Sequence, residues 1–141
     1  MYLAEATLAF KLLSIVERIH KSPEKELKEL GITYGNYISL VILHDQEGIT
    51  QAGLSERQHK DRNVTGQTID KLEKKHLVQR VRDGEDRRIY KLYLTDQGRR
   101  VVEDYWDIMM RGEREQLQKL TVREQEQLQE LLVKMMEQAP Q

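Results

Sequence analysis

Hydrophobic residues near the start of the chain lie at helical spacing in two adjacent stripes over residues 3–20. One stripe holds Leu3, Ala6, Phe10, Leu13 and Val16, and the other holds Leu8, Leu12, Ile15 and Ile19. A helix on the surface of a monomer needs only one such stripe. Two stripes therefore predict a helix that packs against more than one surface, and in so short a chain a second subunit is a natural partner.

The next segment is first polar and then helical in pattern. Residues 22–29 are mostly polar and predict a connector, whereas the apolar face of residues 34–45 predicts a helix. Gly48 stands where a glycine commonly ends a helix. Ile49, which follows it, is a candidate for a very short strand.

Two capping residues then predict a helix-turn-helix. Thr50 is suited to cap a helix over residues 51–58, and Asp61 is suited to cap a second over residues 62–75. Both side chains can accept hydrogen bonds from the free backbone N–H groups of a first helical turn. The buried face of the second helix is expected to hold Thr65, Ile69 and Leu72, joined by Leu77 beyond its end.

A β-hairpin is predicted after these helices. Residues 77–82 and 89–94 have strand-like patterns, and the polar segment DGEDRR between them contains the turn Asp83-Gly84. Such a pattern places a charged tip between two short antiparallel strands.

Two helices are predicted after the hairpin. The first covers residues 95–117, and the second begins at a T-x-x-E capping box made by Thr121 and Glu124. Apolar residues recur along the second at core or helix-pairing spacing, namely Leu128, Leu131, Leu132, Met135 and Met136. The predicted fold class is therefore mainly α with a small β-hairpin.

The composition excludes several kinds of site. The 141 residues include no cysteine, which rules out disulfides, zinc sites with thiolate ligands and cysteine nucleophiles. No apolar run approaches the roughly 18 residues of a membrane helix, and residues 1–13 lack the basic start of a signal peptide. We expect no cofactor, no metal and no enzymatic activity, because no catalytic group stands out and the histidines lack metal-ligand spacing.

Charge is distributed unevenly along the chain. The net charge is −1, yet residues 57–91 contain eleven Lys and Arg against six Asp and Glu. The remaining residues contain twelve basic and eighteen acidic side chains. A basic centre between acidic arms is typical of a local site for a polyanion, although a solvated face of mixed charge remains an alternative.

The second helix of the helix-turn-helix carries candidate DNA contacts. In this motif that helix lies in the DNA major groove, and its first residues here are Arg62, Asn63, Val64, Gly66 and Gln67. Asn and Gln pair with adenine, and an apolar side chain contacts a thymine methyl group. Without the β-hairpin that follows it, the segment is slightly better explained as a helical hairpin that only packs a core.

The hairpin tip carries the other candidates. Its arginines are Arg82, Arg87 and Arg88, and its acidic residues are Asp83, Glu85 and Asp86. A narrow hairpin can enter the minor groove, which attracts arginine, and Asp86 is placed to orient Arg88. A charged tip also prevents strand edges from pairing with other chains, and for the hairpin alone that explanation stays open.

Three pieces of the middle of the chain occur in a specific order and spacing: DKLEKK-x-LV, the D-R-R of the tip and the closing L-T-x-x-G. With the sequence around them, from Ile49 to Gly98, they resemble MarR-family winged-helix regulators, and the likeness continues through both helical arms. The resemblance implies a winged helix-turn-helix core flanked by N- and C-terminal dimerisation helices. It also implies a cytoplasmic homodimer, expected to be a repressor, that binds a pseudo-palindromic DNA operator and is often released by a small phenolic or anionic ligand.

The resemblance assigns roles to particular residues. Asp86 and Arg88 match the D-x-R of the family's wing, with Arg88 in the minor groove, and Asn63, Gly66 and Gln67 fall where residues face bases. The full predicted DNA-binding set is Thr50, Arg62, Asn63, Val64, Gly66, Gln67, Arg82, Asp86, Arg87 and Arg88.

Three departures from the family pattern affect the operator prediction more than the fold. Gln58 stands where a core leucine is usual, and Gly66-Gln67 replaces a frequent Thr-Arg. Gly66 should cost about 1 kcal/mol of helix stability relative to alanine. His76 replaces a glycine, and histidine tolerates the left-handed conformation better than a bulky residue does.

We predict one MarR-type domain over residues 1–141, with a winged helix-turn-helix lobe at 32–98 and dimerisation regions at 1–22 and 99–141. Phe10, Tyr37 and His44 are candidates for an effector site, although simple core packing is the favoured explanation of all three. The alternative function is a winged-helix module that docks an acidic protein without specific DNA binding.

Overall fold

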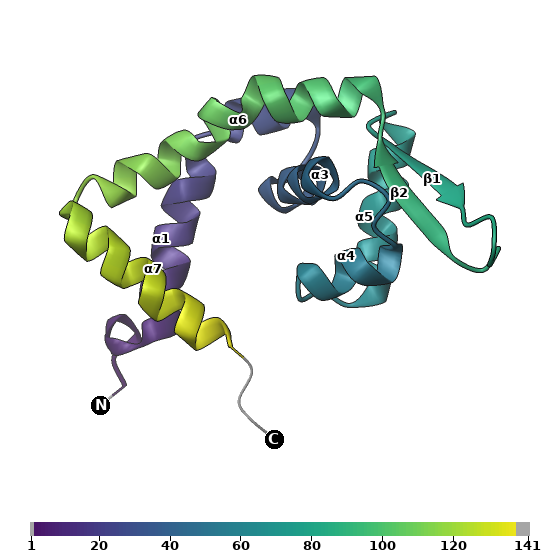
Figure 1. The fold of residues 1–141 in the computed structure, drawn as a ribbon. Coiled ribbons are helices and arrows are strands. Elements are labelled where there is room, and N and C mark those ends of the chain that lie inside the picture. Colours follow the sequence, from purple (N-terminus) through teal and green to yellow (C-terminus); the bar gives the residue numbers. More distant parts are fainter. Residues whose placement is uncertain (1, 138–141) are drawn as a thin grey trace. The chain divides into compact units, whose positions relative to one another are not determined.

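The computed structural model describes residues 2–137, which form seven α-helices, one 3-10 helix and a two-stranded antiparallel hairpin (Figure 1). The elements are η1 (Ala4–Ala6), α1 (Leu8–Lys21), α2 (Glu24–Leu30), α3 (Tyr34–Asp45), α4 (Gln51–Arg57), α5 (Arg62–Lys74), β1 (Val78–Arg82), β2 (Tyr90–Leu94), α6 (Asp96–Leu117) and α7 (Val122–Met136). The predicted class, mainly α with a small hairpin, is confirmed. Across this described part, no helix has both the length and the apolar character needed to span a membrane.

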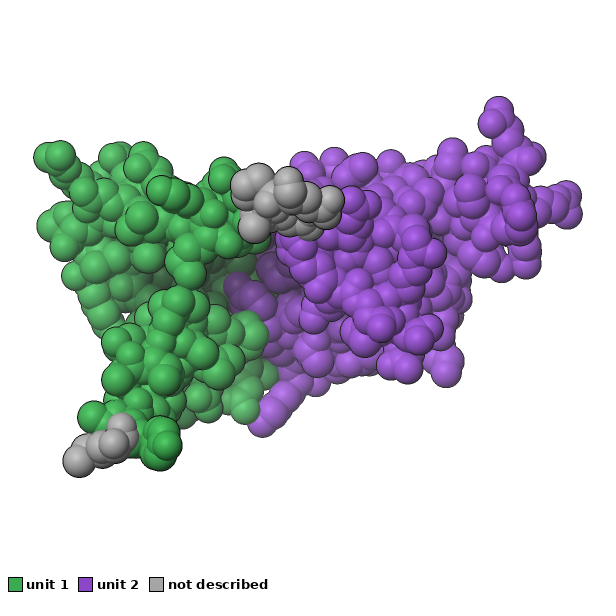
Figure 2. All heavy atoms as spheres, turned by 90° about the horizontal axis from the view of Figure 1, so that it is seen from below, with its two compact units in different colours: residues 1–24, 108–141 green, residues 25–107 purple. Residues whose placement is uncertain are grey.

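The chain divides into two compact units (Figure 2). Residues 25–107 form what we call the winged-helix unit, and residues 1–24 with 108–141 form the helical unit. Helix α6 contributes its first half to the winged-helix unit and its second half to the helical unit. The lobe predicted at residues 32–98 lies inside the winged-helix unit.

The connector predicted at residues 22–29 is wrong, because a helix, α2, occupies Glu24–Leu30. Pro23 and Leu27 are buried and fix one side of this otherwise polar segment. Gly31 has a φ of +69° and ends the helix, and the Ile32 N–H donates to the Leu27 carbonyl at 3.1 Å. This arrangement is the usual closure of a helix by a left-handed glycine.

The core of the winged-helix unit is formed by side chains from each of its helices and from the hairpin. Its fully buried members include Tyr37, Leu40, Leu43, Leu54, Ile69, Leu72 and Leu92. The Tyr37 hydroxyl donates to the Val102 carbonyl at 2.7 Å and so joins α3 to α6. Burial raises the pKa of Tyr37, because the phenolate would lose its hydration.

Removal of this hydroxyl should weaken the unit. We expect Tyr37→Phe to lower the free energy of unfolding by about 1–2 kcal/mol, since the Val102 carbonyl loses its buried donor. Thermal or urea denaturation measures the change. Tyr105→Phe, on α6 of the same unit and half-buried, is the matched control, and an equal loss in both variants would contradict the role given to the Tyr37–Val102 hydrogen bond.

The hairpin is anchored to the start of α4 by a third short segment. Strand β1 pairs with β2 from Val78–Leu94 to Arg82–Tyr90. On the other side of β2, the Gly48 N–H donates to the Leu92 carbonyl and the Leu92 N–H donates to the Ile49 carbonyl, both at 2.9 Å. An isolated bridge also joins Thr50 to Lys91. The short strand expected at Ile49 is not formed there, because the single bridge falls at the next residue, Thr50.

The helical unit leaves much of its apolar surface exposed. Within it, α6 crosses α1 closely at Gly112, where a Cβ atom would lie 2.6 Å from the Ile19 carbonyl oxygen. The predicted Thr121–Glu124 capping box is formed at the start of α7. Neither α1 nor α7 contains a buried residue in the single chain.

Candidate nucleic-acid interface

The helix-turn-helix consists of α4 and α5, and its caps are those expected from the sequence. The Thr50 hydroxyl accepts a hydrogen bond from the Gly53 N–H at 3.0 Å, and the Asp61 carboxylate accepts one from the Asn63 N–H at 2.6 Å. Between the helices, His59 adopts a left-handed φ of +54°. These contacts fix the start of α5, the helix that the motif presents to DNA.

The two helices are held together by a small buried contact as well as by the core. The Ser55 hydroxyl donates to the Thr65 hydroxyl at 2.8 Å, and both side chains are buried. Ile69 and Leu72 continue the buried face of α5, as predicted. The opposite face of α5 is therefore free to carry side chains for recognition.

The predicted base-facing residues lie on that exposed face. Arg62, Asn63, Val64 and Gln67 are exposed, and Val64 is an apolar side chain with 45% of its surface accessible. Gly66 is half-buried. An isolated apolar side chain among polar neighbours suits contact with a thymine methyl group.

Thr50 occupies a different place from these residues. It is half-buried, caps α4 and bridges to Lys91 of β2. In the structure its hydroxyl stabilises the start of α4, and its assignment to the DNA-binding set stays a prediction.

The hairpin tip presents an oriented arginine. Arg88 is 91% exposed, and its guanidinium donates to both carboxylate oxygens of Asp86, each at 3.1 Å. The Arg88 N–H also donates to the Asp86 carboxylate, at 3.0 Å. These hydrogen bonds from Arg88 lower the pKa of Asp86, so that the carboxylate is ionised at neutral pH.

The base of the tip is stiffened by Arg82. Its guanidinium donates to the Arg87 carbonyl at 2.7 Å and lies 4.9 Å from the centre of the Tyr90 ring. Arg82 therefore braces the loop from one strand to the other, in addition to its exposed charge. Arg87 is exposed beside it.

Arg80 is a functional candidate that the sequence analysis missed. It lies on β1, and only 16% of its side chain is exposed, because it is bound to Asp70 and Glu73 of α5. The strand pattern alone gave no signal for this role, since an arginine in a two-stranded hairpin is expected to be solvated. The signal in the sequence is the pair of acidic residues on α5, spaced by three so that both share one helical face.

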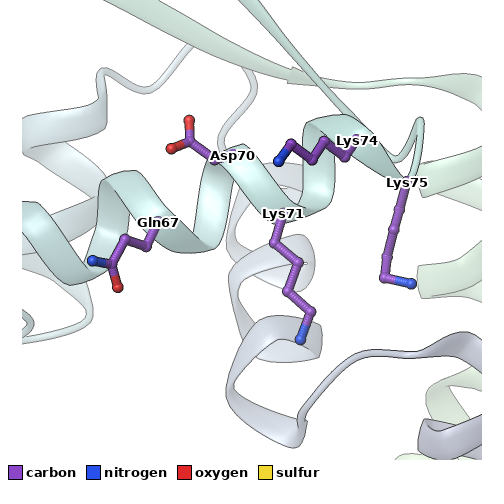
Figure 3. A pocket seen from close by; sticks show the side chains of 5 residues that line it. All are labelled: Gln67, Asp70, Lys71, Lys74 and Lys75. Atoms are coloured by element: carbon purple, nitrogen blue, oxygen red, sulfur yellow. The ribbon is translucent and has the colours of Figure 1, made fainter.

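A shallow hollow lies along the same helix, beyond the predicted base-facing residues. It is lined by Gln67, Asp70, Lys71, Lys74 and Lys75 (Figure 3). Asp70 and Lys71 leave the helix on opposite sides, and the Lys71 ammonium donates to the Asn36 side-chain oxygen at 3.0 Å.

The three residues predicted for an effector site have separate surroundings. Phe10 lies on α1 in the helical unit and is partly exposed, whereas Tyr37 is fully buried in the winged-helix unit. His44 Nε2 lies 3.1 Å from Glu103 Oε1 on α6. Their use by an effector stays a prediction. Within residues 2–137, no group of three His, Asp or Glu side chains is arranged to hold a metal ion.

Comparison with known proteins identifies the architecture around these residues. A sequence model described as the MarR family matches residues 32–90. The helix-turn-helix regulator SarZ of Staphylococcus epidermidis is 35% identical over 92 residues, which are 65% of this chain and 62% of that protein. The crystal structure of an S. aureus MepR–DNA complex aligns with a TM-score of 0.83 at 25% identity, over 92% of this chain and 96% of that one.

The chain belongs to the MarR family. Another relative, the uncharacterized helix-turn-helix transcriptional regulator YybA of Bacillus subtilis (strain 168), is 36% identical over 76 residues, or 54% of this chain. The chain spans about half to two thirds of the length of these curated relatives. In MarR-family terms, α5 is the recognition helix and the β1–β2 hairpin is the wing.

Proposed function

We propose that this chain is a dimeric, DNA-binding transcriptional repressor. The observation that carries the proposal is that one compact unit presents both an exposed polar start of α5 and an exposed, oriented arginine at the wing tip. The recognition helix would enter the major groove and Arg88 the neighbouring minor groove. The likeness to MepR, whose structure was solved with DNA, supports this mode.

The second subunit is proposed from the apolar side chains that the single chain leaves in solvent. They are Leu8, Phe10, Leu12, Leu13, Ile15 and Val16 on α1 and Leu128, Leu131, Val133, Met135 and Met136 on α7. Large apolar side chains exposed in this number on two helices of one unit are typical of a protein–protein contact. Homodimers with twofold symmetry are the commonest soluble oligomers, so a second copy of this chain is the occupant we propose.

Twofold symmetry sets the form of the DNA site. Two recognition helices that are about 34 Å apart meet successive major grooves on one side of the duplex. The operator is then expected to be a pseudo-palindrome, and occupying it represses transcription by excluding other proteins from the same DNA.

We propose the bacterial cytoplasm as the location, because the relatives are bacterial regulators. Release by a small aromatic or anionic ligand stays a prediction.

Selection of duplexes from a random pool tests the proposed function. We expect the wild-type chain to enrich a pseudo-palindromic sequence, and its affinity for that duplex to fall steeply as salt is raised from 50 to 200 mM, because bound phosphates release counterions (about 10³-fold for six contacts). An absence of binding to any duplex at low salt would refute the proposal. It would favour the alternative, a module that docks an acidic protein.

A further inference from the structure

One arginine at the base of the wing connects the wing to the recognition helix. Arg80 of β1 donates to Asp70 Oδ1 at 2.6 Å and to Glu73 Oε1 at 3.3 Å. Both acceptors belong to α5. The side chain therefore points towards the helix, in contrast to that of Arg88, which points into solvent from the tip.

The same guanidinium also binds α4 and the backbone of α5. Its Nε and Nη2 atoms donate to Gln51 Oε1 at 3.3 and 3.2 Å, and Nη2 donates to the Gly66 carbonyl at 3.2 Å. One side chain of the wing thus holds both helices of the helix-turn-helix. Only a planar group with several divergent donors can do so, because a lysine ammonium donates from a single point.

Gly66 provides the space that these contacts require. A Cβ atom at residue 66 would lie 3.2 Å from Gln51 Nε2, closer than an ordinary van der Waals contact. The other amide atom of Gln51, Oε1, is the acceptor of two hydrogen bonds from Arg80. A side chain at residue 66 would therefore displace the amide that orients Arg80 by a few tenths of an ångström.

We propose that Arg80 is a positioning residue which, together with Gln51, Gly66, Asp70 and Glu73, fixes the direction of the wing relative to the recognition helix. We call these five residues the Arg80 joint. Its role in binding rests on the proposed function. Leu92 and its hydrogen bonds to Gly48 and Ile49 hold the base of the hairpin, but two strands alone give the outer wing little stability. Without the joint the outer wing therefore samples several directions, and DNA binding has to order it at a cost in affinity.

Two substitutions separate this role from simple electrostatics. Asp70→Asn removes a negative charge from the basic segment, and the loss of that charge alone would strengthen DNA binding. The Arg80 joint predicts the opposite result, because the wing loses its fixed direction: affinity for the selected duplex falls about tenfold. Arg80→Lys keeps the charge but loses the planar geometry, and we expect a similar loss. Affinity equal to or tighter than wild type in Asp70→Asn would overturn the proposal.

A double-mutant cycle tests whether the joint acts through the wing. In the Arg88→Ala background the wing tip has lost its main contact, so we expect Asp70→Asn to cost at most about twofold further. Fully additive losses would show that Asp70 affects binding by another route and would overturn the proposal.

Amide hydrogen exchange of the free protein gives a measurement that does not depend on DNA. We expect faster exchange across residues 78–94 in Asp70→Asn and Arg80→Lys, with circular dichroism unchanged. Asp45→Asn and Arg57→Lys are the matched controls, because this exposed pair (2.9 Å) joins α3 to α4 away from the wing.

The outcomes distinguish the two proposals. Unchanged exchange in the wing would overturn the Arg80 joint even if DNA is bound. If the wild-type chain binds no duplex, the proposed function fails, and the exchange data then decide whether the joint holds the wing.

Discussion

Replacement of Arg88 with alanine should weaken binding to the selected duplex by about tenfold to a hundredfold, which is the loss expected for one specific groove contact. The expected loss is large because the Asp86 carboxylate already orients the guanidinium, which binds with little further ordering. Folding should not change, since 91% of the side chain is exposed and its partner, Asp86, is only two residues away. Gel-shift or fluorescence-anisotropy titration measures the affinity.

Arg100→Ala is the matched control for this prediction. Arg100 is an exposed arginine of the same unit, on α6 and outside the predicted DNA-binding set. Its removal subtracts the same charge, so the difference between the two variants reports on the position of Arg88 and excludes a general effect of net charge. Equal affinities for both variants would show that the wing tip does not enter the groove.

The second large effect is expected at the proposed subunit contact. Leu13→Glu, on α1, places a charge on a side chain that is 68% exposed in the single chain. Burial of that unpaired charge between two copies is unfavourable, so we expect the variant to sediment as a 16.7-kDa monomer. Its DNA affinity should fall by about a hundredfold or more, because the two half-sites no longer bind as one unit.

Two further measurements make this result specific. Lys11→Gln, an exposed polar position on the same helix, should leave the sedimentation of the protein unchanged. Leu131→Glu on α7 should reproduce the effect of Leu13→Glu, with circular dichroism confirming that each variant is folded. A Leu13→Glu variant that remains dimeric would exclude α1 from the contact.

Sequence patterns predicted the elements whose signals are local. The caps at Thr50, Asp61 and Thr121 are formed as expected, because a capping side chain bonds to backbone two or three residues away. The left-handed φ of +61° at His76 is likewise a local property and was anticipated.

Elements that depend on distant packing were harder to predict. Helix α2 contains seven residues, of which Leu27 alone is buried. One buried residue gives no helical repeat of apolar positions that the sequence could reveal. So short a helix is stabilised by tertiary contacts. The joint of Arg80 with α4 and α5 connects residues up to 29 positions apart. The sequence predicts only that Gly66 weakens its helix, and it gives no sign that a Cβ atom there would lie 3.2 Å from the side-chain nitrogen of Gln51.

The way the two units share the chain has an evolutionary consequence. The winged-helix unit is one uninterrupted segment, whereas the helical unit is assembled from both ends of the sequence. Recombination can therefore exchange the winged-helix unit as one segment of the gene, which we call the cassette. A change in the helical unit requires matched changes at two distant places in the gene. The match to the family falls at residues 32–90, inside the cassette. Under the proposed function, new DNA preferences can arise in such a lineage without altering which copies pair.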